Sequence, residues 1–146
     1  TWDDLEWVRE HWDGPLVIKG ILDADDARIA AEVGVDALVV SNHGGRQLDG
    51  TPPSISVLPS VAEAAGDGVE VLMDGGVRSG LDIVKALSLG ARAVMVGRPW
   101  AWAVAGGGRA AVEQVLTTME RELHVAMGLC GRTDVADLDR SALANA

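Results

Sequence analysis

The sequence predicts an α/β protein with parallel strands and covering helices, whose four βα units are half of a (β/α)8 barrel. Short apolar, strand-like runs alternate with helical patterns along the chain, which is typical of a parallel sheet covered by helices. Polar, glycine-rich segments follow the strand-like runs, at the edge where α/β sheets and barrels bind ligands. Four βα units are half of the barrel's eight, although strands this short and apolar suit an open sheet as well.

The strands are expected at residues 15–19, 37–40, 69–73 and 93–96. Each is a short apolar run, and Gly20 is expected to end the first. The helices are expected at residues 2–12, 24–33, 54–65, 80–89 and 110–127. Asp23 suits the N-cap of the second helix and Gly34 the position after its end. Pro59 falls inside the third, and an apolar stripe defines the last.

Composition limits the possible functions. The chain has 146 residues and a formal net charge of −10, so one domain over residues 1–146 is expected. It has no Lys/Arg-rich run, which argues against a nucleic-acid or anionic-membrane partner. One cysteine and no apparent signal or membrane span indicate a cytoplasmic protein. The CxxC and HExxH metal patterns are absent, so no metal is expected. There are five tryptophans but no tyrosine.

The segment SNHGGRQLDG, residues 41–50, follows the second strand. His43 suits proton transfer near neutral pH, and Arg46 offers a planar fork for a carboxylate. The two glycines between them permit a tight turn beside a ligand. The loop is therefore a candidate for binding a carboxylic acid and removing a proton from it. The other interpretation is a histidine capped by Asp49 and an arginine paired with surface acids.

Two further candidate groups follow other strands. Lys19 ends the first strand, and it either has a partner there or extends to solvent. Asp74-Gly75-Gly76-Val77-Arg78 and Gly97-Arg98 follow the third and fourth strands. Such glycines leave backbone N–H groups free at helix N-termini, and the arginines add positive charge, which favours a phosphate site. Tight turns with surface arginines are the alternative.

The segments VIKGI, LVVSNHGGRQLDG and VLMDGGVRSGLDIVKALSLGARAVMVGRPW, in this order and spacing, resemble the FMN-dependent α-hydroxy-acid dehydrogenase and oxidase family. That family includes glycolate oxidase and L-lactate dehydrogenase. The opening TWDDLEWVREHWDGP and the closing MERELHVAMGLCGRTDVADLDR resemble the family at those places too. The resemblance therefore covers essentially all 146 residues. It implies an FMN hydroxy-acid dehydrogenase domain with a complete (β/α)8 TIM barrel, of which this chain matches the second half, strands five to eight, as a C-terminal half-barrel.

The resemblance also implies roles for individual residues. His43 would be the catalytic base and Arg46 the clamp for the carboxylate of a small L-2-hydroxy acid, which becomes the 2-oxo acid. Lys19 and Ser41 would contact the flavin of FMN. The phosphate and ribityl chain would be held by Asp74, Gly75, Gly76, Val77, Arg78, Gly97 and Arg98. Oxygen or another acceptor would then take the electrons.

The family also uses tyrosines and a histidine-orienting aspartate from the other half of the barrel. This half is therefore expected to need a missing N-terminal half or a further copy in a homo-oligomer, and the initial Thr1 suggests a piece of a longer protein. A non-catalytic FMN- or phosphate-binding half-barrel is the alternative function. Another phosphate-binding barrel enzyme is a third, although the His43 and Arg46 loop is not expected there.

Overall fold

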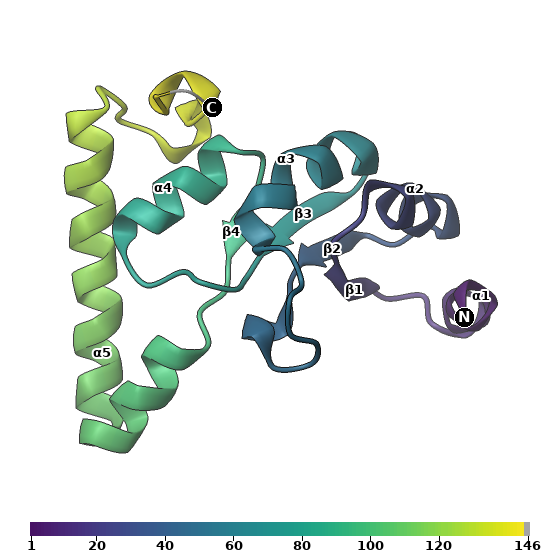
Figure 1. Ribbon diagram of the computed structural model, residues 1–146, viewed down its shortest axis with the longest axis horizontal. Coiled ribbons are helices and arrows are strands. Elements are labelled where there is room, and N and C mark those ends of the chain that lie inside the picture. The colour runs from purple at the N-terminus through teal and green to yellow at the C-terminus, as the bar shows by residue number, and fades with distance from the viewer. Residues whose placement is uncertain (145–146) are drawn as a thin grey trace.

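The computed structural model describes residues 1–144, so the last two residues of the predicted domain lie outside it. Four parallel strands form one sheet in the order β1-β2-β3-β4 (Figure 1). They are β1 (Val17–Ile21), β2 (Ala37–Val40), β3 (Glu70–Met73) and β4 (Ala93–Val94). The helices are α1 (Trp2–His11), α2 (Ala24–Val33), α3 (Ser54–Ala65), α4 (Gly80–Ser88) and α5 (Arg98–Leu129), with single 3-10 turns η1 (His43–Gly45), η2 (Val135–Asp137) and η3 (Arg140–Ala142). The predicted half-barrel topology is confirmed.

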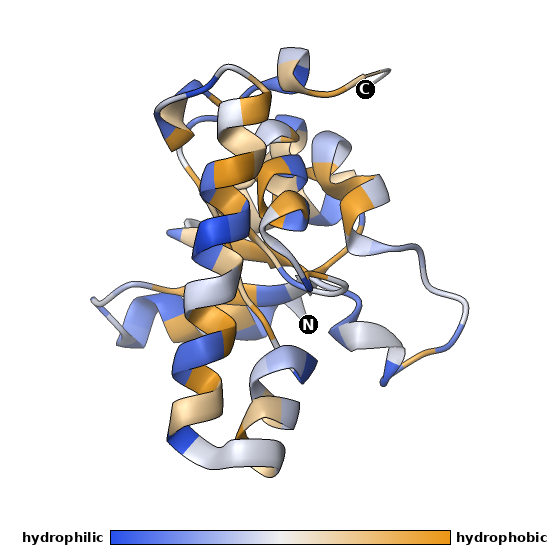
Figure 2. Ribbon diagram, turned by 90° about the vertical axis from the view of Figure 1, so that its left-hand side faces the viewer, coloured by the Kyte–Doolittle hydropathy of each residue, from blue (hydrophilic) through white to orange (hydrophobic). Residues whose placement is uncertain are grey.

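The sheet has one face covered by helices and one face that carries Lys19. Ile18 pairs with Leu38, which pairs with Val71, and this row belongs to the hydrophobic core. Leu38 is fully buried, and burial of such a side chain stabilises the fold by about 1.5–3 kcal/mol. In the next row Lys19 pairs with Val39, and because strand side chains alternate, this row faces the other side of the sheet. Figure 2 shows the strands mostly in the hydrophobic colour behind α5.

Several element boundaries differ from the sequence-based expectation, and β4, for example, ends at Val94 rather than at residue 96. Strand β1 continues through Gly20 to Ile21, with an irregular register between Lys19 and Ile21. Helix α5 begins at Arg98 rather than at residue 110, and its helical conformation is interrupted at Gly107 and Gly108. At that interruption the chain reverses direction, and the longer second segment returns beside α4 (Figure 1). Among residues 1–144 no helix is both long and apolar enough to span a membrane.

Helix caps and one ion pair fix the ends of β1 and α2. The Asp23 side chain accepts a hydrogen bond from the N–H of Asp25, and Gly34 ends α2 with φ of 83°, as predicted. At the opposite end of the sheet from Lys19, Asp36 Oδ2 accepts from the N–H of Leu16 at 2.7 Å and pairs with Arg9 at 3.1 Å. These contacts tie α1 and the start of β1 to the start of β2.

Candidate functional site

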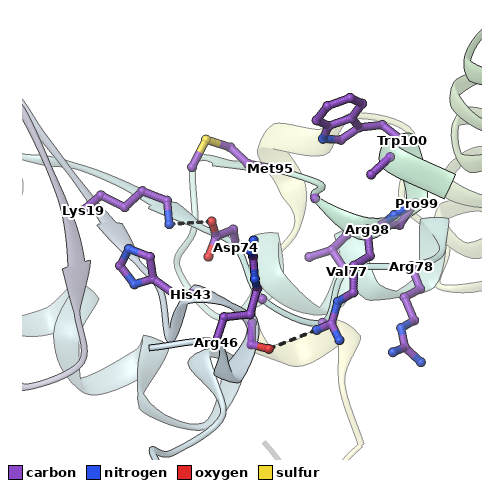
Figure 3. A pocket seen from close by; sticks show the side chains of 15 residues that line it. Lys19, His43, Arg46, Asp74, Val77, Arg78, Met95, Arg98, Pro99 and Trp100 are labelled. Carbon is purple, nitrogen blue, oxygen red and sulfur yellow. Dashed lines mark hydrogen bonds and ion pairs between the residues drawn. The ribbon is translucent and has the colours of Figure 1, made fainter. Parts of the chain in front are cut away.

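A cavity of about 330 Å3 lies at the carboxyl ends of the strands (Figure 3). This volume is in the range of small-molecule sites. Lys19 of β1 and the segments that follow β2, β3 and β4 contribute to its lining: Lys19, His43, Gly44, Arg46, Asp74, Gly75, Gly76, Val77, Arg78, Met95, Gly97, Arg98, Pro99, Trp100 and Ala101. The structure thus brings together ten of the predicted site residues, and Ser41 alone of that set does not line the cavity.

Lys19 has two partners at the cavity wall. Its Nζ donates to Ser41 Oγ at 2.7 Å. It also lies 2.9 Å from Asp74 Oδ2, a contact drawn in Figure 3. Ser41 is 1% exposed, whereas the Lys19 side chain is 38% exposed. Lys19 therefore neither extends freely to solvent nor lies in the core. Its ammonium is held by two neighbouring strand ends, with one side open to the cavity.

The loop after β2 adopts a left-handed conformation at three successive residues: His43, Gly44 and Gly45 have φ of 54°, 67° and 75°. For a non-glycine residue such as His43 this conformation costs roughly 1–2 kcal/mol, so the loop requires restraints. Two are side chains: Ser41 Oγ accepts from the His43 N–H at 3.1 Å, and Asn42 Oδ1 accepts from the Gly44 N–H at 3.0 Å. The two preceding residues therefore hold the backbone that presents His43.

The side chains of His43 and Arg46 are exposed at the cavity. Within residues 1–144 the His43 ring makes no hydrogen bond and Arg46 makes no ion pair, while Asp49 bonds the N–H of Gly50. The alternative of a capped histidine and a paired arginine is therefore not what the structure shows. A Cβ placed on Gly20 lies 3.2 Å from His43 Cε1, so the absence of a side chain at Gly20 gives the His43 ring its space.

Unpaired polar groups gather on the other side of the cavity. Asp74 Oδ1 is buried and has no hydrogen-bond partner among the described residues. Gly75 and Gly76 have φ of 89° and 90°, and over the described part of the chain their N–H groups have no acceptor. Gly97 precedes α5, whose first turn has no side-chain cap. Free N–H groups at a turn and at a helix N-terminus are suited to an anion.

The N-terminus of α4, by contrast, is already occupied by acceptors. Asp82 Oδ2 accepts from the Arg78 N–H at 3.0 Å, Ser79 Oγ from the Asp82 N–H at 3.2 Å, and Glu122 Oε2 from the Gly80 N–H at 2.8 Å. The sequence analysis expected free N–H groups at both helix N-termini. In the structure the free N–H groups lie at the Gly75-Gly76 turn and at the start of α5. Those at the start of α4 are not free, because Glu122 and Asp82 accept their hydrogen bonds.

The charge of the cavity is opposite to that of the chain. The chain has a formal net charge of −10, yet the charged residues of the lining, histidine aside, are four cations and one carboxylate: Lys19, Arg46, Arg78, Arg98 and Asp74. Arg98 also donates to the carbonyl oxygen of Gly44 at 3.3 Å, which joins the start of α5 to the His43 loop (Figure 3). Such a concentration of positive charge favours an anionic ligand.

The fold and the site define a class of protein: half of a (β/α)8 barrel with a cationic ligand site at the carboxyl ends of its strands. The chain belongs to the FMN-dependent dehydrogenase family, whose sequence pattern matches residues 1–145. It is 55% identical over 143 residues to an L-lactate dehydrogenase of Caulobacter vibrioides (strain NA1000 / CB15N) and 54% identical to one of Xanthomonas campestris pv. campestris (strain B100). In each, the match covers 98% of this chain and 37% of the relative.

Solved structures of mandelate oxidase also resemble this chain. Mandelate oxidase with (S)-2-phenylpropionate superposes with a TM-score of 0.92 at 51% identity, covering 96% of this chain and 42% of that one. A mutant of mandelate oxidase with the monooxide FMN adduct gives a TM-score of 0.91, also at 51% identity, and covers 96% and 45%. The chain therefore spans less than half the length of these relatives.

The residues present fit FMN. A phosphate dianion matches the arginines and the free N–H groups of Gly75 and Gly76, and a ribityl hydroxyl is the kind of donor that Asp74 Oδ1 lacks. Lys19 would supply a positive charge for a flavin ring that gains negative charge on reduction. The phosphate, the ribityl chain and the reduced flavin of FMN would thus each meet a chemically suited group in this cavity.

The sequence analysis missed several residues at or beside the site. Asn42 hydrogen-bonds Gly44 and Ser54, and an Asn two residues before a pair of glycines is a turn signal that was available. Met95 and Trp100 line the cavity. Trp100 and Trp102 are 48% and 63% exposed, because α5 begins at Arg98 and carries them away from the sheet.

Proposed function

We propose that this chain carries the proton-transfer, carboxylate-binding and FMN-binding groups for oxidation of an L-2-hydroxy acid to the 2-oxo acid. The observation that supports this most is that one cavity brings together two groups of residues. His43 and Arg46, which have no ion-pair partner among residues 1–144, follow β2, and the positively charged segments suited to an anion follow β3 and β4. The names of its relatives, L-lactate dehydrogenase and mandelate oxidase, are consistent with this substrate class.

In this mechanism each residue has a distinct task. Arg46 binds the substrate carboxylate through its planar guanidinium. His43 accepts one of the two protons released when the CH–OH group becomes C=O. FMN, when bound, supplies the acceptor for the pair of electrons. Lys19, held by Ser41 and Asp74, stabilises negative charge at the flavin edge of the site.

The proposed contacts with FMN are also assigned to individual residues. Asp74, Gly75, Gly76 and Val77 would hold the ribityl chain and phosphate, together with Arg78, Gly97 and Arg98. Ser41 contributes through Lys19 and the His43 backbone, because its Oγ bonds to both. Within the half-barrel domain, these residues leave the substrate's side chain largely unenclosed. We propose that the first half of the barrel, or a further copy of the chain, provides the remaining walls.

A second candidate is a half-barrel that binds FMN or phosphate without catalysis. The observation in its favour is the contrast between the two sides of the cavity: within residues 1–144 the anion side presents Arg78, Arg98 and the free N–H groups of Gly75 and Gly76, whereas no carboxylate bonds to the His43 ring. The chain also has no tyrosine. Binding is therefore expected to tolerate the loss of groups that catalysis requires.

The test is to add FMN to the purified chain and record the flavin spectrum before and after anaerobic L-lactate, glycolate or mandelate. Bound flavin that bleaches with one substrate, and a His43→Ala variant that binds FMN without bleaching, are the results expected for the enzyme. Bound flavin that never bleaches supports the non-catalytic candidate. A folded chain that binds no FMN contradicts both proposals for this chain.

A further inference from the structure

We propose that Asn42 and Ser54 are positioning residues that lock the loop of residues 42–46 onto the loop of residues 74–78. The first loop carries His43 and Arg46, and the second carries the anion side of the cavity. This inference rests on the proposed function, because the two loops have a proton-transfer side and a flavin side only there. Neither Asn42 nor Ser54 lines the cavity, so both act through other residues.

Asn42 forms hydrogen bonds through both its side chain and its backbone N–H. Its Oδ1 accepts from the Gly44 N–H at 3.0 Å, and its Nδ2 donates to the carbonyl oxygen of Pro52 at 3.4 Å. Its backbone N–H donates to Ser54 Oγ at 3.1 Å, and Ser54 is 1% exposed at the start of α3. The left-handed His43 loop is thereby anchored to a buried group of a helix that belongs to the core.

Gly75 lies directly against this anchor. A Cβ placed on Gly75 would be 2.8 Å from both Asn42 Oδ1 and Ser54 Oγ. Gly76 has almost the same φ, 90° against 89°, but nothing lies within 4 Å of its Cβ position. Contact with the anchor, rather than backbone conformation, therefore distinguishes Gly75. Gly75 adjoins Asp74. A movement of either loop would therefore be transmitted to the other loop through the contacts of Gly75 with Asn42 Oδ1 and Ser54 Oγ.

The matched pair Gly75→Ala and Gly76→Ala tests the coupling. Both substitutions impose similar backbone strain, but only Gly75→Ala pushes against Asn42 and Ser54. In the cofactor-free chain, NMR correlation spectra resolve the rings of His11, His43 and His124. We expect Gly75→Ala to shift or broaden the His43 ring signal several-fold more than Gly76→Ala does, with the other two histidines unchanged. Equal effects on His43, or none, overturn the proposal.

Asn42 itself provides the rescue experiment. Asn42→Ala removes the acceptor for Gly44 and is expected to move the His43 signal, whereas Asn42→Asp keeps an acceptor there and is expected to restore it. If Gly75→Ala does not fold, the effect of Asn42→Ala on the amide NMR signals of Gly75 and Gly76 is measured instead. A larger change at Gly75 supports the lock, and equal changes contradict it.

FMN binding separates this inference from the proposed function. By quenching of flavin fluorescence, Ser54→Ala is expected to weaken FMN binding about fivefold, the effect of one lost hydrogen bond. The control is Ser56→Ala, an exposed serine of the same helix turn whose Oγ bonds only Pro53. A parent chain that binds no FMN refutes the proposed function, while the histidine spectra still decide the coupling. Equal FMN affinity of the two serine variants contradicts the lock.

Discussion

At the scale of single residues, Lys19 shows how a site group is held without being buried. A lysine at the end of an apolar strand either finds a partner or extends to solvent, and the sequence does not decide between these. The structure does, because the parallel register sets Lys19 beside Val39 and places Ser41 and Asp74 at the neighbouring strand ends. Asp74, with a side chain 19% exposed, depends on this ammonium for its charge balance.

Replacement of Lys19 by methionine is therefore expected to lower the free energy of unfolding by about 1–3 kcal/mol, because Asp74 loses its partner. Addition of Asp74→Asn to Lys19→Met should recover part of that loss, since the uncompensated carboxylate is removed. Urea denaturation of the parent, the single variant and the double variant measures this. Lys85→Met, at the exposed and only other lysine of the sequence, is the control. A double variant less stable than Lys19→Met would contradict this account.

The gathering of the predicted residues in one place was more predictable than their contacts. Ten of the predicted residues line one cavity, because parallel strands bring their carboxyl ends to one edge and the glycine-rich segments all follow strands. The anchoring role of Ser54 was not predictable, because it depends on where α3 packs, a tertiary contact without a local pattern. Asn42 lies in the quoted motif, but its bond to Gly44 becomes meaningful only once the left-handed turn is known.

At the scale of elements, the apolar periodicity predicted all four strands and five helices, and the main error was the start of α5. Three successive glycines, 106–108, argued against a helix before residue 110. The helix nevertheless begins at Arg98, with Pro99 in its first turn, and is interrupted at Gly107 and Gly108. Glycine there permits the reversal, since Gly108 has φ of 61°. This earlier start places Arg98 at a helix N-terminus beside the cavity.

Asp36 links three elements, and its contribution to stability is expected to depend on pH. The hydrogen bond from the Leu16 N–H and, secondarily, the Arg9 guanidinium hold the pKa of the Asp36 carboxyl below its ordinary value. Because the folded pKa is lowered, the stabilisation is present above the ordinary pKa of about 3.9 and is lost as the pH falls through the lowered pKa.

Thermal unfolding of Asp36→Asn and the parent at neutral pH and near pH 3 measures this contribution. The midpoint of Asp36→Asn should be lower at neutral pH, and the difference should shrink in acid. Asp67→Asn is the matched control, because in the described residues the Asp67 side chain makes no hydrogen bond or ion pair. A difference that does not change with pH would show that the Arg9 and Leu16 contacts do not depend on the charge of Asp36.

At the scale of the whole molecule, the described residues form a sheet with two unpaired edges, β1 and β4. In a closed (β/α)8 barrel these edges meet further strands, and this chain matches only 37% of the length of its L-lactate dehydrogenase relatives. Apolar side chains are exposed where closure would cover them: Val17 is 48% and Met95 38% exposed. Exposed apolar edges of this kind promote pairing with other chains.

Alone in solution, the chain is therefore expected to associate through β1 despite its net charge of −10. Val17→Lys places a charge on that edge and should weaken association about tenfold, or roughly 1.4 kcal/mol. Light scattering across a concentration series measures the effect.

The control is Val125→Lys, which makes the same charge change at a position of α5 that is 63% exposed and far from β1 in the chain. This variant should have little influence on association. If the parent remains a 15.2 kDa monomer at all concentrations, or if both variants weaken association equally, the open edge of β1 does not drive assembly. If only Val17→Lys weakens association, the edge of β1 is the surface that pairs with another chain, at the place where a closed barrel would have a further strand.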